Sequence, residues 1–156
     1  MLRLGLAIAL FVLALDQATK LRVLDLMSPP RAIEVTGFFN LVLVWNRGIS
    51  FGLLGGGGMT QAWVLAAFGT VVAGGLLIWL HRAALPWLPS LGVGLIVGGA
   101  IGNVIDRLRY GAVVDFVDLH AAGWHWPAFN VADSAISVGV VALIIDAVLR
   151  DGRETA

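Results

Sequence analysis

Two aspartates interrupt otherwise apolar stretches of this sequence. Asp115 lies in VVDFVDLH, residues 113–120, and Asp133 lies in FNVADSAI, residues 129–136. Both stretches adjoin segments of membrane-spanning length, where carboxylates are costly. One ionised and one protonated aspartate can share a water molecule: the first removes its proton, and the second protonates a scissile amide. The two aspartates are therefore candidates for a hydrolytic pair, although their spacing alone is a weak indication.

Other unusual polar residues accompany this pair, and each has an ordinary structural explanation. Asp16 and Lys20 have the i, i+4 spacing of a helix-stabilising ion pair. Asn130 is a suitable N-cap for a following helix, with Asp133 in its first turn. A third group shares one helix face and can be a helix-end charge cluster: Asn103, Asp106 and Arg107. These explanations apply to the residues one at a time. They do not explain why all of them, together with Asn46 and Asp118, are expected on the same side of the membrane.

His120 and His125 raise the question of a metal site among these aspartates. Their spacing of five residues, with no third nitrogen or thiolate nearby, is unfavourable for zinc. The chain has no cysteine, which excludes disulfides, thiolate ligands and a cysteine nucleophile of its own. We expect neither a metal nor another cofactor.

The composition indicates an integral membrane protein. Hydrophobic residues make up 59 % of the 156 residues and charged residues only 13 %, against about 25 % charged in soluble domains. The mean hydropathy is +0.91. The formal net charge is zero, so nothing indicates a nucleic-acid partner. The length predicts a single domain over residues 1–156.

Four segments are long and apolar enough to cross a bilayer: 2–20, 61–80, 89–107 and 131–150. The first also resembles a cleaved signal peptide, with Arg3, an apolar run and small residues, but the three later spans favour the first span of a bundle. In the third segment, Gly94, Gly98 and Gly102 share a face on which another helix can approach closely.

The connection from about residue 28 to 58 has the alternation of strands, between two prolines and a glycine run. We predict a small β-rich segment at the membrane surface, whose LLGGGG end is a candidate lid. Residues 108–130 are predicted to form a connection whose Tyr and Trp side chains suit the water–lipid boundary; within it, AAGWHW, residues 121–126, has no assigned role. The fold class is thus a mainly α membrane protein with four transmembrane helices and a small β-rich segment between the first two.

Charge leaves the orientation ambiguous. An even number of spans puts both termini on one side, which holds four basic residues against six on the other. Counted plainly, the positive-inside rule places the termini outside. Several of those six basic residues lie among the unusual polar residues, so they are not a reliable guide.

The chain resembles the lipoprotein signal peptidase (signal peptidase II) family. The matching motifs run in family order over nearly the whole chain: DQATK at 16–20, NRGISFGLL at 46–54, GGAIGNVIDRLRYGAVVDF at 98–116 and PAFNVADSAI at 127–136. The resemblance implies an aspartic endopeptidase without cofactors. It would cleave the signal peptide from prolipoproteins just before a cysteine that carries diacylglycerol. Asp115 and Asp133 match the catalytic pair.

The resemblance further implies supporting or substrate-binding roles for the other motif residues, namely Asp16, Lys20, Asn46, Gly48, Asn103, Asp106, Arg107 and Asn130. It implies a multi-pass protein of the bacterial inner membrane, with cytoplasmic termini and a periplasmic active site and β segment. The expected partners are lipidated prolipoproteins and membrane lipid, with the enzyme as a monomer. Ile49 and Ser50 depart mildly from the family pattern, and Asp118 lies outside the motifs and is expected to be dispensable.

Within the pair, we predict that Asp133 is the more acidic member and that Asp115 holds the proton. A helix dipole favours a charged Asp133, and the apolar run before Asp115 favours its neutral form. Two other functions remain as alternatives, a small transporter or ion-binding bundle and a non-catalytic assembly or lipid-binding protein. The apolar middles of the four spans count against a transporter, which needs polar groups at the bilayer midplane.

Overall fold

A computed structural model describes residues 1–29, 31–48 and 59–154 of the chain. It contains four long helices, α1 (Leu2–Leu26), α2 (Met59–Arg82), α3 (Trp87–Tyr110) and α4 (Val131–Glu154). Each is long and apolar enough to cross a membrane. Each also extends a few residues beyond the segment expected from hydropathy. The polar turns at the helix ends leave the hydrocarbon but stay helical, because the helix still satisfies the hydrogen bonds of their backbone groups. The predicted four-helix membrane fold is confirmed.

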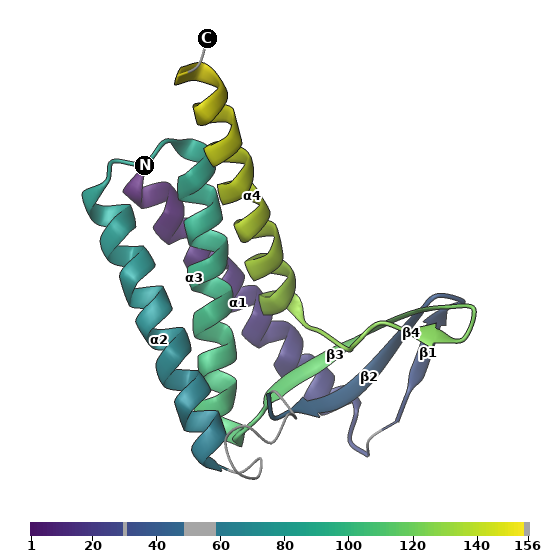
Figure 1. Cartoon of the computed structure of the whole chain (residues 1–156). Helices are drawn as coiled ribbons and strands as arrows, with labels where there is room; N and C mark the ends of the chain where they lie inside the picture. Colours follow the sequence, from purple (N-terminus) through teal and green to yellow (C-terminus); the bar gives the residue numbers. More distant parts are fainter. Residues whose placement is uncertain (30, 49–58, 155–156) are drawn as a thin grey trace.

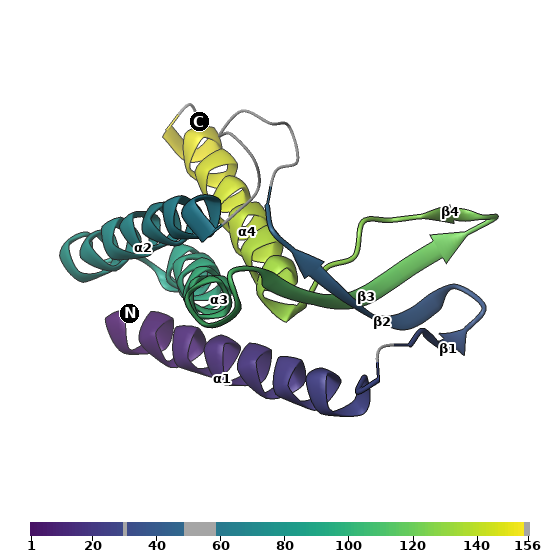
Figure 2. The same cartoon turned by 90° about the horizontal axis from the view of Figure 1, so that it is seen from below.

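Helix α3 is the centre of the bundle, and α1, α2 and α4 pack around it (Figures 1 and 2). Within its most apolar stretch, 67 % of the residues are buried, against 17–22 % in the other three helices. Its glycines permit this packing. A Cβ added at Gly98 would lie 2.6 Å from the carbonyl oxygen of Ala9 on α1, and one at Gly92 would lie 2.8 Å from that of Gly139 on α4. The predicted close approach at the glycine face is confirmed.

A four-stranded antiparallel sheet extends from one end of the bundle, in the order β1 (Ile33–Thr36), β2 (Phe39–Asn46), β3 (Val113–Ala121), β4 (Trp124–His125) (Figure 1). The expected β-rich segment supplies only β1 and β2. The other two strands come from the connection between α3 and α4, so Asp115 lies in a strand and not in a loop as expected. Pairing β3 with β2 satisfies backbone groups in a stretch that is fully buried from Val113 to Phe116.

The sheet is anchored to the end of α1. Val23 of α1 and Met27, which caps the end of this helix, form a buried cluster with Phe116 of β3, and partly buried residues of both connections pack against it. Both termini lie at the opposite end of the bundle (Figure 1), as an even number of spans requires. The candidate lid, Ile49 and Ser50 lie outside the described residues.

Candidate active site

Asp133 lies in the first turn of α4 and is held by reciprocal hydrogen bonds with Asn130. The Asp133 N–H donates to Asn130 Oδ1 (3.0 Å), and the Asn130 N–H donates to Asp133 Oδ2 (3.1 Å). This exchange is the arrangement of a capping box, in which a helix N-terminus satisfies its free N–H groups. The second carboxylate oxygen, Oδ1, accepts a bond from Asn103 Nδ2 on α3 (2.9 Å). The predicted N-cap role of Asn130 is confirmed.

Asp115 comes from β3 and is only 1 % exposed. Its Oδ2 accepts a hydrogen bond from Asn46 Nδ2 at the end of β2 (2.9 Å), and its Oδ1 accepts one from Asn130 Nδ2 (2.7 Å). Gly48 supports this arrangement because its N–H donates to Asn46 Oδ1 (2.9 Å). The φ of Gly48 is +97°, and a Cβ there would overlap the Leu65 side chain, so glycine is required.

One asparagine connects the two carboxylates. Asn130 donates to Asp115 Oδ1 through Nδ2 (2.7 Å) and to Asp133 Oδ2 through its backbone N–H (3.1 Å). Burial raises the pKa of Asp115 to about 6, and the negative charge of Asp133 acts in the same direction. Bonds from Asn46 and Asn130 and the charge of Lys20 oppose the rise. The structure therefore brings the two sequence-predicted aspartates into one electrostatically coupled site.

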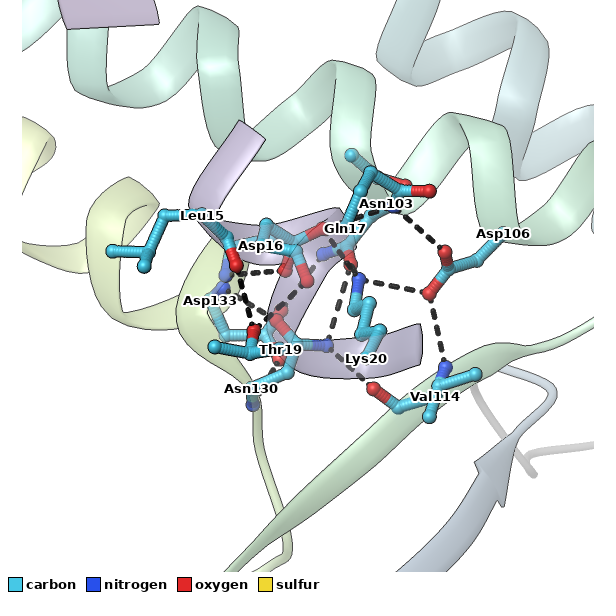
Figure 3. Close-up of polar contacts among 12 residues, drawn as sticks. Leu15, Asp16, Gln17, Thr19, Lys20, Asn103, Asp106, Val114, Asn130 and Asp133 are labelled. Atoms are coloured by element: carbon cyan, nitrogen blue, oxygen red, sulfur yellow. Dashed lines mark hydrogen bonds and ion pairs between the residues drawn. The ribbon is translucent and has the colours of Figure 1, made fainter. Parts of the chain in front are cut away.

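A buried ion cluster centred on Lys20 of α1 adjoins this site (Figure 3). Lys20 Nζ is 2.9 Å from Asp16 Oδ2 and 2.8 Å from Asp106 Oδ2, and none of the three side chains is more than 2 % exposed. Nζ also donates to Asn103 Oδ1 (3.0 Å). The predicted Asp16–Lys20 ion pair is confirmed, but it belongs to a larger network that joins α1 to α3.

Each acid of this cluster also holds the backbone next to one of the paired aspartates. Asp106 Oδ2 accepts the N–H of Val114 (3.1 Å), the residue before Asp115. Asp16 Oδ1 accepts the N–H of Ala132 (3.0 Å), the residue before Asp133. Lys20 binds both acids. This one cation therefore fixes, relative to each other, the two segments that carry Asp115 and Asp133.

Two members of the cluster were not predicted as site residues. Gln17 Nε2 lies 3.1 Å from both Asp16 Oδ2 and Asp106 Oδ1 and 3.3 Å from the Gly102 carbonyl oxygen, so it is a neutral donor between the two acids. Gly102 makes room for Asp16, since a Cβ at Gly102 would overlap Asp16 Oδ2. In the sequence, Gly102 is noticeable only as a member of the glycine face of the third apolar segment. Gln17 is noticeable only as part of the motif DQATK.

Arg107 lies beside the pair without a carboxylate partner among the described residues. Its Nη1 donates to the Asn103 carbonyl oxygen (3.2 Å), whereas its buried Nε has no hydrogen-bond partner there. The charges of Asp106, Asp115 and Asp133 act on it. Arg107 therefore keeps donor capacity next to the carboxylates.

Asp118 and the two histidines form a separate group further along the sheet. Asp118 accepts bonds from Asn40 Nδ2 (3.0 Å) and pairs with His125 Nδ1 (2.9 Å). The His125 bond, followed by the Asn40 bond, lowers the pKa of Asp118. The His120 ring stacks on that of His125 at 4.9 Å. In the described part of the chain, no three His, Asp or Glu side chains are grouped as metal ligands.

A pocket of about 370 Å³ opens beside Asp133. The residues that line it come from the start of α4 and the connection that precedes it: Trp126, Phe129, Asp133, Ser134, Ser137 and Val138. Trp126 belongs to the stretch 121–126 that had no assigned role, and its position beside Asp133 was not foreseen from the sequence.

The fold and the site together define a multi-pass membrane protein whose buried carboxylates gather at one end of the bundle. The family described as signal peptidase (SPase) II matches residues 8–149. The chain belongs to this family of proteases. Membership of this family gives no support to the alternative of a small transporter.

Named relatives and solved structures agree with this assignment. The lipoprotein signal peptidases of Paraburkholderia phytofirmans and Burkholderia thailandensis are each 48 % identical over 145 residues, which is 93 % of this chain and 84 % and 87 % of theirs. A bacterial membrane enzyme solved by the in meso method at 2.3 Å is similar with a TM-score of 0.82 and 31 % identity, covering 97 % of this chain and 91 % of that one. A second, solved at 1.9 Å, has a TM-score of 0.79, 32 % identity and coverages of 92 % and 91 %.

Proposed function

We propose that this protein is an aspartic endopeptidase that cleaves the signal peptide from prolipoproteins, just before a diacylglyceryl-modified cysteine. The observation that carries the proposal is the coupling of Asp115 and Asp133 through Asn130, with the pKa of Asp115 raised to about 6. Membership of the signal peptidase II family and the names of the relatives supply the substrate class. No cofactor is required by this chemistry.

Asp133 acts as the base in this mechanism. It lies at a helix N-terminus, where the dipole and the Asn130 N–H stabilise a carboxylate. It removes a proton from water as the water oxygen attacks the scissile carbonyl carbon. Asp115 donates its proton to the carbonyl oxygen. When the tetrahedral intermediate collapses, the C–N bond breaks, the leaving amine takes the proton from Asp133, and Asp115 recovers its own.

The surrounding residues position this pair and the peptide. Lys20, Asp16 and Asp106 hold the backbone beside each aspartate, and Asn46, Asn103 and Asn130 orient the carboxylates. Arg107, a half-buried cation on which the charges of Asp133 and Asp115 act, binds a substrate carbonyl oxygen in this proposal. We further propose that the chain works as one integral domain and as a monomer, in the bacterial inner membrane, with cytoplasmic termini and the site at the periplasmic face.

The test is cleavage of a diacylglyceryl-modified prolipoprotein by the purified protein, beside the unlipidated form. We expect cleavage of the lipidated form only, and a loss of at least about 10³-fold in Asp115→Asn and Asp133→Asn, because each removes one proton-transfer role. Asp146→Asn is the matched control, since Asp146 pairs with Arg150 near the other end of α4. Cleavage that survives in a folded Asp115→Asn or Asp133→Asn protein would refute the pair, and no cleavage by the folded wild type would refute the function.

A further inference from the structure

Gln17 lies between the two acids of the buried ion cluster (Figure 3). Its Nε2 is 3.1 Å from Asp16 Oδ2 and 3.1 Å from Asp106 Oδ1. Both acids are ion-pair partners of Lys20, so their carboxylates accept hydrogen bonds and do not donate them. The atom of Gln17 that contacts both is therefore the amide nitrogen, which has two N–H groups. The two acids are thus bridged twice, once by a cation and once by a neutral amide.

Asp106 uses its two carboxylate oxygens differently. Oδ2 binds Lys20 Nζ (2.8 Å) and accepts the Val114 N–H (3.1 Å), whereas Oδ1 accepts from Gln17. Asp106 is 1 % exposed, and a buried carboxylate oxygen that loses its donor is costly. The χ2 torsion of an aspartate is soft. Without Gln17, the carboxylate would therefore turn to bring Oδ1 towards Lys20, and the bond from the Val114 N–H would weaken.

Val114 is held at both of its backbone polar groups. Its N–H donates to Asp106, and its carbonyl oxygen accepts a hydrogen bond from Asn130 Nδ2 (3.2 Å). The same Asn130 Nδ2 donates to Asp115 Oδ1 (2.7 Å). A shift of Val114 therefore moves Asp115 relative to Asp133. Shifts of about 1 Å at a reacting group can lower a rate by as much as about 10²-fold.

We propose that Gln17 is a positioning residue for the aspartate pair, an inference that rests on the proposed function. Its amide holds Asp106 in the orientation that binds the Val114 N–H, and Val114 in turn sets the place of Asp115. The position requires a neutral side chain. A second cation there would lie beside Lys20 Nζ, and an anion would place a third carboxylate around one lysine. An amide supplies donors to both acids without adding charge.

Gln17→Leu removes both N–H donors and keeps a side chain of similar size. With a diacylglyceryl-modified prolipoprotein as substrate, we expect kcat to fall about tenfold and KM to stay nearly unchanged, because Asp115 is misplaced while the substrate still binds. Thr19→Val is the matched control on the same helix. The Thr19 hydroxyl donates to the carbonyl oxygens of Leu15 and Asp16 in its own helix (2.8 and 2.9 Å), so this variant should keep the wild-type kcat. Full kcat in a folded Gln17→Leu protein overturns the proposal.

Gln17→Glu distinguishes hydrogen bonding from packing, because glutamate has the shape of glutamine. When protonated, its hydroxyl donates to one of the two acids; when ionised, it donates nothing and repels both. We expect the ratio of its kcat to that of wild type to fall about tenfold as the pH rises from about 5 to about 8. The corresponding ratio for Gln17→Leu should not change with pH. A ratio for Gln17→Glu that is equally independent of pH overturns the role of the amide.

Hydrogen exchange tests the same role without catalysis. In Gln17→Leu, the Val114 amide should exchange about tenfold faster, because its acceptor Asp106 is less well held. The Val117 amide, which donates to the Phe129 carbonyl oxygen (2.8 Å), should exchange as in wild type. Unchanged exchange at Val114 overturns the positioning role while wild-type cleavage still supports the function. Failure of the wild type to cleave overturns the function, and the exchange at Val114 still decides whether Gln17 holds Asp106.

Discussion

At the scale of single residues, Lys20 is the shared partner of two buried acids. Removing Lys20 leaves Asp16 and Asp106 without their cation in a site where neither is more than 1 % exposed. We expect Lys20→Met to lower the free energy of unfolding by about 3–5 kcal/mol. Asp106→Asn should cost less because the Lys20–Asp16 pair remains. Denaturant titration in detergent measures both.

Arg22→Met is the matched control for Lys20→Met. Arg22 lies two residues further along α1 and pairs with Asp25 at 3.7 Å, with both side chains about three-quarters exposed. An exposed pair of this kind contributes about 0–1 kcal/mol. Equal losses in the two variants would contradict a special role for Lys20.

The raised pKa of Asp115 makes stability depend on pH with a definite sign. In the unfolded chain this aspartate has a pKa of about 3.9, against about 6 in the folded protein. Between these values the folded state binds more protons, so this group's contribution to stability is largest below about pH 4 and is lost as the pH rises to about 6. We expect wild type to lose about 2–3 kcal/mol more than Asp115→Asn between pH 4 and 6.5.

The same pKa governs activity if Asp115 is the proton donor. The value of kcat/KM should then fall as the pH rises above about 6, with the position of the fall belonging to the coupled pair. Activity that keeps rising through pH 7.5 would contradict a proton donor with a pKa of about 6. Infrared titration with labelled aspartate identifies the protonated member directly.

At the scale of elements, the contact of α1 with α3 sets the position of Asp16. A methyl group at Gly102 would overlap the Asp16 carboxylate and displace the acid that holds the Ala132 N–H. We expect Gly102→Ala to lower kcat about 10–100-fold, because small misplacements of catalytic groups have effects of this size. Cleavage assays on protein verified as folded measure it.

Gly74→Ala on α2 is the control, since a Cβ there would meet no atom of another described segment within 4 Å. Alanine at an open helix position stabilises by roughly 0.5–1 kcal/mol, so this variant should keep full activity. If Gly102→Ala also keeps full activity, the position of Asp16 does not limit catalysis.

The outer part of the sheet is held by Asp118, which joins β2 through Asn40 and β4 through His125. Asp118→Ala should speed hydrogen exchange of the amides in residues 38–40 and 119–125 while leaving cleavage largely intact. Because the pKa of Asp118 is lowered, its stabilising effect is present above about pH 3.9 and is lost in stronger acid. A large loss of cleavage would show that this part of the sheet takes part in catalysis.

At the scale of the whole molecule, the orientation is open to a direct test because the chain has no cysteine. Gly37→Cys, in the turn between β1 and β2, should react with a membrane-impermeant maleimide in intact spheroplasts. Ala83→Cys, in the exposed connection between α2 and α3, should react only after permeabilisation. The reverse pattern would place the site in the cytoplasm and favour the plain count of basic residues.

The sequence by itself determined the four spans, because an apolar segment in hydrocarbon must satisfy its backbone groups as a helix. It also determined the glycine face of α3 and most polar residues of the site, since their motifs are continuous in the chain. It did not place β3 in the sheet. Pairing β2 with β3 joins Asn46 to Val113, 67 positions further along the chain, and such pairing depends on how the helices bring two connections together.

Only the tertiary structure decided which groups meet at the site. The bond from the Ala132 N–H to Asp16 joins positions 116 residues apart, and that from Gln17 to Asp106 joins positions 89 apart. Local spacing carries no information about such contacts, which arise from the packing of α1 and α4 on α3. For this reason the Asp16–Lys20 pair, which the sequence predicts as a helix-stabilising contact, belongs in the folded protein to a network that holds the backbone beside Asp115 and Asp133.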